Sequence, residues 1–160
     1  MRPHALAARF TVFCLAFSAA SCALRAADLS ASPRYFPMTS AGGPPLPFSE
    51  AVRLGDTLYV SGQIGNAPGG VALVKGGIVP EARQALENIR AILERHGSSL
   101  DRVVKCTVFL ADIKDWFAFN QVYRELFKTN LPARSALATS GLALGARVEV
   151  ECVAFVPPNP

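Results

Sequence analysis

The sequence lacks most of the patterns that mark a metal centre, a nucleotide site or a membrane span. Beyond the first residues, no apolar run is long enough to cross a bilayer. There is no G-x-S-x-G elbow, no phosphate-binding P-loop and no G-x-G-x-x-G turn. These absences argue against serine hydrolases of the α/β type, P-loop nucleotidases and Rossmann dehydrogenases.

Histidine and cysteine are scarce. The only histidines are His4, near the N-terminus, and His96, which is predicted to cap backbone carbonyls at the end of a helix. Mechanisms that need two histidines are thereby disfavoured. Cys106 and Cys152 lack the close spacing of metal ligands, so we expect no metal. They are predicted to be small core residues on strands, and a disulfide between them stays open.

The N-terminus has the pattern of a secretion signal. Arg2 and Arg9 form a basic start, and residues 10–20 are apolar or small but too few for a comfortable membrane span. We therefore expect residues 1–23 to be a signal peptide and the mature protein to be exported to the bacterial periplasm. The segment ending at Cys22 also weakly resembles a lipobox, which leaves a lipid anchor open.

The predicted mature chain has little net charge. Loss of Arg2 and Arg9 reduces the 16 basic residues to 14, against 12 acidic residues that all lie further along. Proteins that bind nucleic acids through phosphates have a clear basic excess. The composition therefore predicts no nucleic-acid partner.

Hydrophobic periodicity predicts one α+β domain. Residues 24–47 are rich in proline and are predicted to be an extended linker, followed by a domain over 48–157. The predicted order is β-β-α-β-α-β-β, and packing of both helices on one face of a mixed sheet is the simplest arrangement. The expected bounds are strands 50–54 and 57–64, helix 80–96, strand 102–110, helix 115–128, and strands 134–142 and 147–156.

Two kinds of charged residue on strands could carry chemistry. Arg134 opens an apolar strand, where it either reaches solvent or clamps a substrate carboxylate with its planar guanidinium. Glu149 and Glu151 alternate with apolar residues near the C-terminus. Their pattern alone favours a solvated face, and the alternative is a general base held near water.

Motifs spread over residues 48–156 resemble the RidA/YjgF family of reactive intermediate deaminases. In chain order they are VSGQI (60–64), EARQALENI (81–89), VKCTVFL (104–110), NQVY (120–123), PARS (132–135) and VEVEC (148–152). The resemblance covers about two-thirds of the chain, and the order and spacing of the motifs are specific.

The resemblance implies a chorismate-mutase-like fold, assembled as a homotrimer with sites between subunits. It implies hydrolysis of small imine and enamine carboxylates to 2-oxo acids and ammonia, with no metal or organic cofactor. By this resemblance Arg134 binds the substrate carboxylate and Glu149 positions a water molecule. Phe48, Ser61 and Asn120 are the implied site-lining residues.

Three positions differ from the family pattern. Phe48 replaces a common tyrosine, Ala136 a common cysteine and Glu50 a common glutamine, so the substrate range stays open.

Two other functions remain possible for this sequence. The first is a trimer that binds small carboxylates without turnover. The second is an RNA-cleaving protein, which the balanced charge and the single histidine of the domain disfavour.

Overall fold

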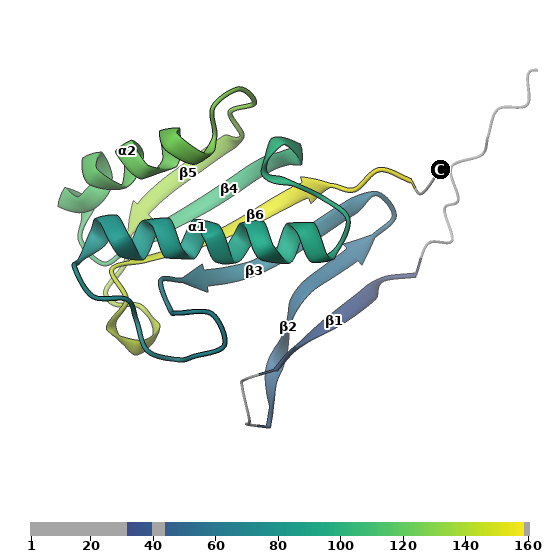
Figure 1. Ribbon diagram of the computed structural model, residues 1–160, viewed down its shortest axis with the longest axis horizontal. Helices are drawn as coiled ribbons and strands as arrows, with labels where there is room; N and C mark the ends of the chain where they lie inside the picture. Colours follow the sequence, from purple (N-terminus) through teal and green to yellow (C-terminus); the bar gives the residue numbers. More distant parts are fainter. Residues whose placement is uncertain (1–31, 40–43, 159–160) are drawn as a thin grey trace, which may run out of the picture.

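Six strands form one mixed sheet, and two helices cover one of its faces (Figure 1). The computed structural model describes residues 32–39 and 44–158. The strands are β1 Arg34–Thr39, β2 Pro45–Leu54, β3 Thr57–Ile64, β4 Val103–Leu110, β5 Ala133–Ala138 and β6 Val148–Phe155. The helices are α1 Ile78–Arg95 and α2 Trp116–Leu126. Within the described residues, no helix is both long and apolar enough to span a membrane. The predicted signal peptide, residues 1–23, lies outside the described residues.

The strand order in the sheet is β1-β2-β3-β6-β4-β5. Neighbouring strands are antiparallel, except that β5 pairs with β4 in parallel. The last strand of the chain, β6, is therefore central, between β3 and β4, whereas β1 and β5 form the two edges. The mixed sheet and the two helices on one face confirm the predicted α+β class.

The helix α1 follows its sequence pattern closely. Ala82, Leu86, Ile89 and Leu93 recur at helical spacing and are fully buried against the sheet. Gly97, just beyond the helix, has a φ of 80°, a left-handed value that glycine adopts without steric cost. The apolar stripe therefore determines both the helix and the face on which it packs.

Alternation along β4 and β6 divides the sheet into a helix-covered face and a helix-free face. The residues buried beneath the helices are Cys106, Val108 and Leu110 in β4 and Val148, Val150, Cys152 and Ala154 in β6. Residues between them point the other way, because successive side chains of a strand alternate between faces. Glu149 and Glu151 therefore lie on the helix-free face.

The predicted linker over 24–47 is wrong where it meets the sheet. Residues 34–39 form the additional strand β1, and β2 begins at Pro45 rather than at the predicted residue 50. Pro37 is tolerated because it lies in an edge strand, where the register of β1 against β2 shifts. The part of β2 before Ala51 has no paired partner in β3, so its prolines interrupt no central ladder.

Other element boundaries differ from prediction by up to four residues, and two of the differences have a local cause. The helix α1 begins at Ile78, two residues early, with Pro80 still within its first turn, where the missing N–H costs no helical bond. The strand predicted over 134–142 ends at Ala138. There the backbone N–H of Thr139 donates to Leu110, and the Thr139 hydroxyl turns toward the carbonyl of Gly141.

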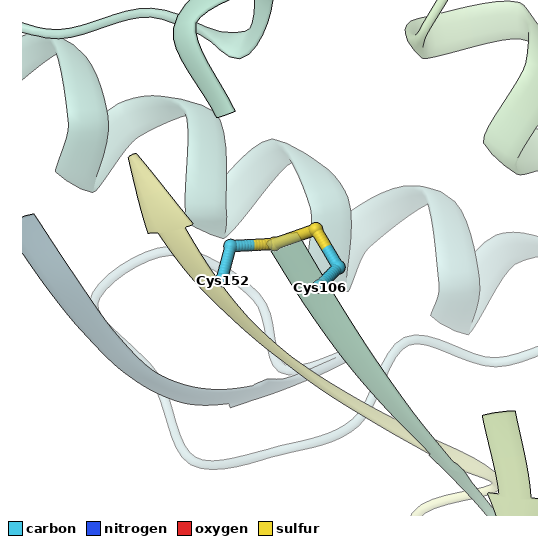
Figure 2. The surroundings of a disulfide bond; sticks show 2 residues. All are labelled: Cys106 and Cys152. Atoms are coloured by element: carbon cyan, nitrogen blue, oxygen red, sulfur yellow. A yellow bond between two sulfur atoms is a disulfide. The ribbon is translucent and has the colours of Figure 1, made fainter. Parts of the chain in front are cut away.

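A disulfide joins Cys106 of β4 to Cys152 of β6, beneath helix α1 (Figure 2). The two residues are directly opposite in the antiparallel register, with their Cα atoms 4.2 Å apart. Both are buried in the core. The sequence had left core thiols and a disulfide as alternatives, and the register of β4 against β6 places the sulfurs in bonding contact.

Reduction of this disulfide is expected to lower the free energy of unfolding by about 2–5 kcal/mol, because the bridge restricts the unfolded chain. The linked residues are 46 positions apart, so a long loop is closed. Urea unfolding with and without dithiothreitol measures the difference, and a Cys106→Ala/Cys152→Ala variant should not respond to the reductant. Equal stability of oxidised and reduced wild-type protein would contradict the prediction.

Candidate active site

Arg134 lies on the helix-covered face, held against helix α2. Its Nη2 donates to Oδ1 of Asn120 at 2.6 Å. Its guanidinium carbon is 4.6 Å from the ring centre of Tyr123 and 5.6 Å from that of Phe119. These contacts fix the plane of the Arg134 guanidinium group. No other hydrogen bond of the Arg134 side chain is found among the described residues. Its remaining N–H groups are therefore available to a carboxylate.

Tyr123 forms the floor beneath Arg134. The ring is buried, and its hydroxyl has no hydrogen-bond partner within residues 32–39 and 44–158. Burial raises the pKa of Tyr123 to about 12, and the positive charge of Arg134 opposes the rise. Tyr123 therefore stays neutral and presents a π face to the guanidinium. Tyr123 belongs to the helix predicted over 115–128, and its contact with Arg134 depends on how α2 packs over β5.

Glu149 lies on the helix-free face, in the centre of the sheet. The side chain is half-buried, and burial, followed by the negative charge of Glu151, raises the pKa of Glu149. No hydrogen bond or ion pair engages its carboxylate in the described part of the chain. A carboxylate that is partly desolvated and not engaged by protein donors can accept a proton from water.

Gly62 in β3 makes room for this carboxylate. A Cβ at position 62 would overlap the Oε1 atom of Glu149 and crowd the rest of its carboxyl group. Gly62 is not among the site residues predicted from the sequence. An isolated glycine in a strand signals the close approach of another group, so the signal was present in the VSGQI motif.

A Gly62→Ala substitution is expected to displace the Glu149 carboxylate and lower the rate of the reaction proposed below by roughly 100-fold, the usual cost of a misplaced group. Gly141→Ala is a matched control, because a Cβ there meets nothing within 4 Å. Steady-state kinetics of both variants test the prediction. Wild-type turnover by Gly62→Ala would show that the position of this carboxylate does not matter.

The structure brings the predicted site residues together in two groups rather than one. Asn120 contacts Arg134, and Gly62 of the VSGQI motif contacts Glu149. The strands that carry Arg134 and Glu149 are separated by β4, and the two side chains point to opposite faces of the sheet. Within one copy of the described chain, no hydrogen bond or ion pair joins them.

The other predicted lining residues lie toward the β3 side of the sheet. Ser61 of β3 donates its hydroxyl hydrogen bond to the carbonyl of Ser49 at 2.6 Å, so it holds β2 against β3. Phe48 in β2 is 51% exposed. Strands β2 and β3 are separated from β5 by β6 and β4, so both residues are carried on strands away from that of Arg134.

The prediction that the His96 side chain caps helix carbonyls is wrong. Its backbone N–H closes the helix, whereas Nε2 of the ring lies 2.8 Å from Oε1 of Glu50. The ring is also stacked on Phe36 of β1, a strand that is absent from the predicted order. Among the described residues, no group of His, Cys, Asp and Glu side chains could hold a metal ion.

The fold and the two groups define a small α+β protein with an oriented arginine and an unpaired acid on opposite faces of its sheet. Known proteins resemble this chain in sequence and in fold. A family profile described as Endoribonuclease L-PSP matches residues 38–156. The chain belongs to this family, which is the RidA/YjgF family.

The chain resembles known proteins in sequence and in structure. The chain is 46% identical over 112 residues to human 2-iminobutanoate/2-iminopropanoate deaminase, an alignment that covers 70% of this chain and 82% of the human protein. The fold matches RidA from an Antarctic Psychrobacter with a TM-score of 0.70 and 36% identity, covering 77% of this chain and all of that one. It also matches E. coli TdcF with bound serine, with a TM-score of 0.69, 30% identity and coverage of 78% and 100%.

Proposed function

We propose that this protein hydrolyses 2-imino acids, and the enamines in equilibrium with them, to 2-oxo acids and ammonia. The observation that carries the proposal is the presence of an oriented, available guanidinium at Arg134 and an unpaired, half-buried carboxylate at Glu149. Relatives at 45–47% identity are named 2-iminobutanoate/2-iminopropanoate deaminase, which supports the same reaction here.

The residues suit the chemistry of an imine. Arg134 pairs with the substrate carboxylate and orients the imine carbon, which is already electrophilic. The substrate reacts as the iminium ion, and Glu149 accepts a proton from water as its oxygen bonds to this carbon and the C=N π electrons move to nitrogen, which gives a carbinolamine. Glu149 then returns the proton to the nitrogen, the C–N bond breaks as ammonia leaves, and the carbinolamine hydroxyl gives its proton to Glu149 as the C=O bond of the 2-oxo acid forms.

We infer that the protein is a homotrimer and that each active site lies between two neighbouring subunits. Arg134 and Glu149 face opposite sides of one sheet, so a substrate contacts both groups only if they come from neighbouring subunits. The helix-free face also exposes the large apolar side chains of Tyr59 and Phe155, at 48% and 45%. Such exposure is typical of a surface that packs against a partner.

A coupled assay tests the function. An amino acid oxidase or dehydratase generates 2-iminopropanoate or a bulkier analogue in place, and the assay follows accelerated release of the 2-oxo acid over the spontaneous rate. Light scattering on the same sample tests the trimer. A monomer at micromolar concentration that still deaminates would contradict the shared site, whereas no acceleration for any imine would contradict the function.

Binding without turnover is the second candidate, favoured by the exposed Phe48, which has no phenol at a position where the family commonly has a tyrosine. Calorimetry with 2-oxobutanoate separates the two functions, because a binding protein gives a saturable signal without catalysis. RNA cleavage has only the family description in its favour. In the described part of the chain the one histidine, His96, is engaged by Glu50 and Phe36.

We also propose export, with loss of residues 1–23. The N-terminal pattern supports it, as does the Cys106–Cys152 disulfide, because such bridges persist mainly in oxidising compartments. Intact-mass measurement of protein from the native envelope tests the proposal, and Met1 still attached would contradict it. A diacylglyceryl mass on Cys22 would identify a lipid anchor.

A further inference from the structure

Four basic side chains surround a cleft at the sheet edge opposite β5. The cleft has a volume of about 380 Å³ and lies between β1, β2 and the C-terminal end of α1. We call Arg34, Arg53, Arg95 and His96 the basic pocket; the other lining residues are Phe36, Gly97, Val156, Pro157 and Pro158. No acidic residue is part of the lining. The pocket is separate from both groups of the candidate active site.

Two of the arginines are direct cross-strand neighbours. Arg34 of β1 pairs with Arg53 of β2 in the antiparallel register, and like charges in this position destabilise a sheet. Asp56 is 3.9 Å from Arg53, but its side chain is half exposed, so this ion pair contributes little. Among the described residues, Arg34 has no carboxylate within salt-bridge distance. The repulsion is therefore only weakly compensated within the described residues.

Contacts with other protein groups restrict the side chains of Arg53, Arg34 and His96. Nε of Arg53 donates to the carbonyl of Gly55 at 2.9 Å. The guanidinium of Arg34 lies 5.5 Å from the ring centre of Phe36, and that ring stacks on His96 at 3.9 Å. Side chains fixed in this way lose less conformational entropy on binding than free surface arginines.

Glu50 interacts with the other two basic residues of the pocket, Arg95 and His96. One of its carboxylate oxygens is 2.8 Å from His96, and the other accepts a hydrogen bond from Arg95 at 2.8 Å. Glu50 offsets the charge of Arg95, and Asp56 can offset at most one further guanidinium charge. The partial negative charge at the end of a helix, about half an elementary charge, does not cancel the third. The pocket therefore keeps a positive charge, and three guanidinium groups line one small volume.

We propose that the basic pocket binds a phosphate group, either the free ion or a phosphomonoester. A tetrahedral oxyanion offers enough acceptor oxygens to contact three separate guanidinium groups, and arginine forks match its geometry. Bound between Arg34 and Arg53, it would convert their repulsion into a shared attraction. It would also join β1 and β2 to the end of α1.

Titration of the full chain with inorganic phosphate, at ionic strength kept constant with chloride, tests the site by calorimetry and by thermal unfolding. Saturable binding with a rise in Tm is expected for the wild type. Arg34→Gln/Arg53→Gln is expected to lower the affinity at least tenfold, and without phosphate to be no less stable than the wild type. Single Arg34→Gln gives the same test if the double variant fails to fold.

The matched control is Arg83→Gln/Arg90→Gln, which removes the same charge from the exposed surface of α1. It should bind phosphate like the wild type. Equal weakening in this control would show non-specific charge attraction and overturn the site, as would no saturable binding by the wild type or equal binding of acetate. Tighter binding of phenyl phosphate than of inorganic phosphate would identify a phosphomonoester as the ligand, and the reverse order would identify the free ion.

Discussion

Arg134→Ala is expected to lower kcat/KM for 2-iminopropanoate roughly 30-fold to several thousand-fold. Removing one partner of a desolvated charge pair costs about 2–5 kcal/mol, and each 1.36 kcal/mol corresponds to about a tenfold change in rate. The structure supports the assignment because Asn120, Tyr123 and Phe119 fix the guanidinium while leaving donors available. Steady-state kinetics with imine generated in place measure the effect.

Two further variants separate the role of Arg134 from its packing. Arg134→Lys should recover little activity, because an ammonium group keeps the charge but not the planar fork. Arg83→Ala removes an exposed arginine elsewhere and should react at the wild-type rate. Near-ultraviolet circular dichroism checks that Arg134→Ala is folded. A folded Arg134→Ala enzyme with wild-type kinetics would remove Arg134 from the site.

Glu149→Gln is expected to lower kcat by about 10²–10⁴-fold, the usual contribution of a general acid–base group. The amide keeps the shape of the side chain but cannot accept a proton. Binding of 2-oxobutanoate should change much less than kcat, because Arg134 holds the carboxylate. A loss of product binding as large as the loss of kcat would instead assign Glu149 to substrate binding.

The pH profile provides a second test of Glu149. Activity needs its charged form, and burial together with Glu151 raises the pKa of Glu149. The rate should therefore rise with pH through a value above the ordinary range for a glutamate. Glu151→Gln removes one of the two causes, so this rise should move to lower pH. An unchanged profile in Glu151→Gln would contradict the assignment.

The contribution of Glu149 to the free energy of unfolding should fall as the pH rises, whereas its contribution to activity should increase. Because the pKa of Glu149 is higher in the folded than in the unfolded protein, the folded state favours the protonated form. This contribution is fully present below the unfolded-state pKa and is lost as the pH rises through the folded-state pKa. At neutral pH, Glu149→Gln should therefore be at least as stable as the wild type, so its loss of activity cannot be attributed to unfolding.

Much of the fold could be predicted because its signals are local. The helix predicted over 80–96 and the two adjacent strands predicted over 50–54 and 57–64 depend on residues a few positions apart, and α1, β2 and β3 confirm them. Strand β1 was not predicted, because prolines argue against a strand by themselves. Its pairing with β2 at a sheet edge makes Pro37 acceptable, and edge position is a property of the whole sheet.

The sequence by itself determined the α+β class, the helix-covered core, and the arginine and glutamate proposed to act on the substrate. Alternation also placed Glu149 on the opposite face from its buried neighbours. Only the tertiary structure decided that Arg134 lies on the other face against Tyr123, that Gly62 makes room for Glu149, that Cys106 meets Cys152, and that Arg34 meets Arg53. The reason is physical: periodicity gives the face of each residue within its own strand or helix, whereas contacts between distant residues depend on strand order, register and helix packing.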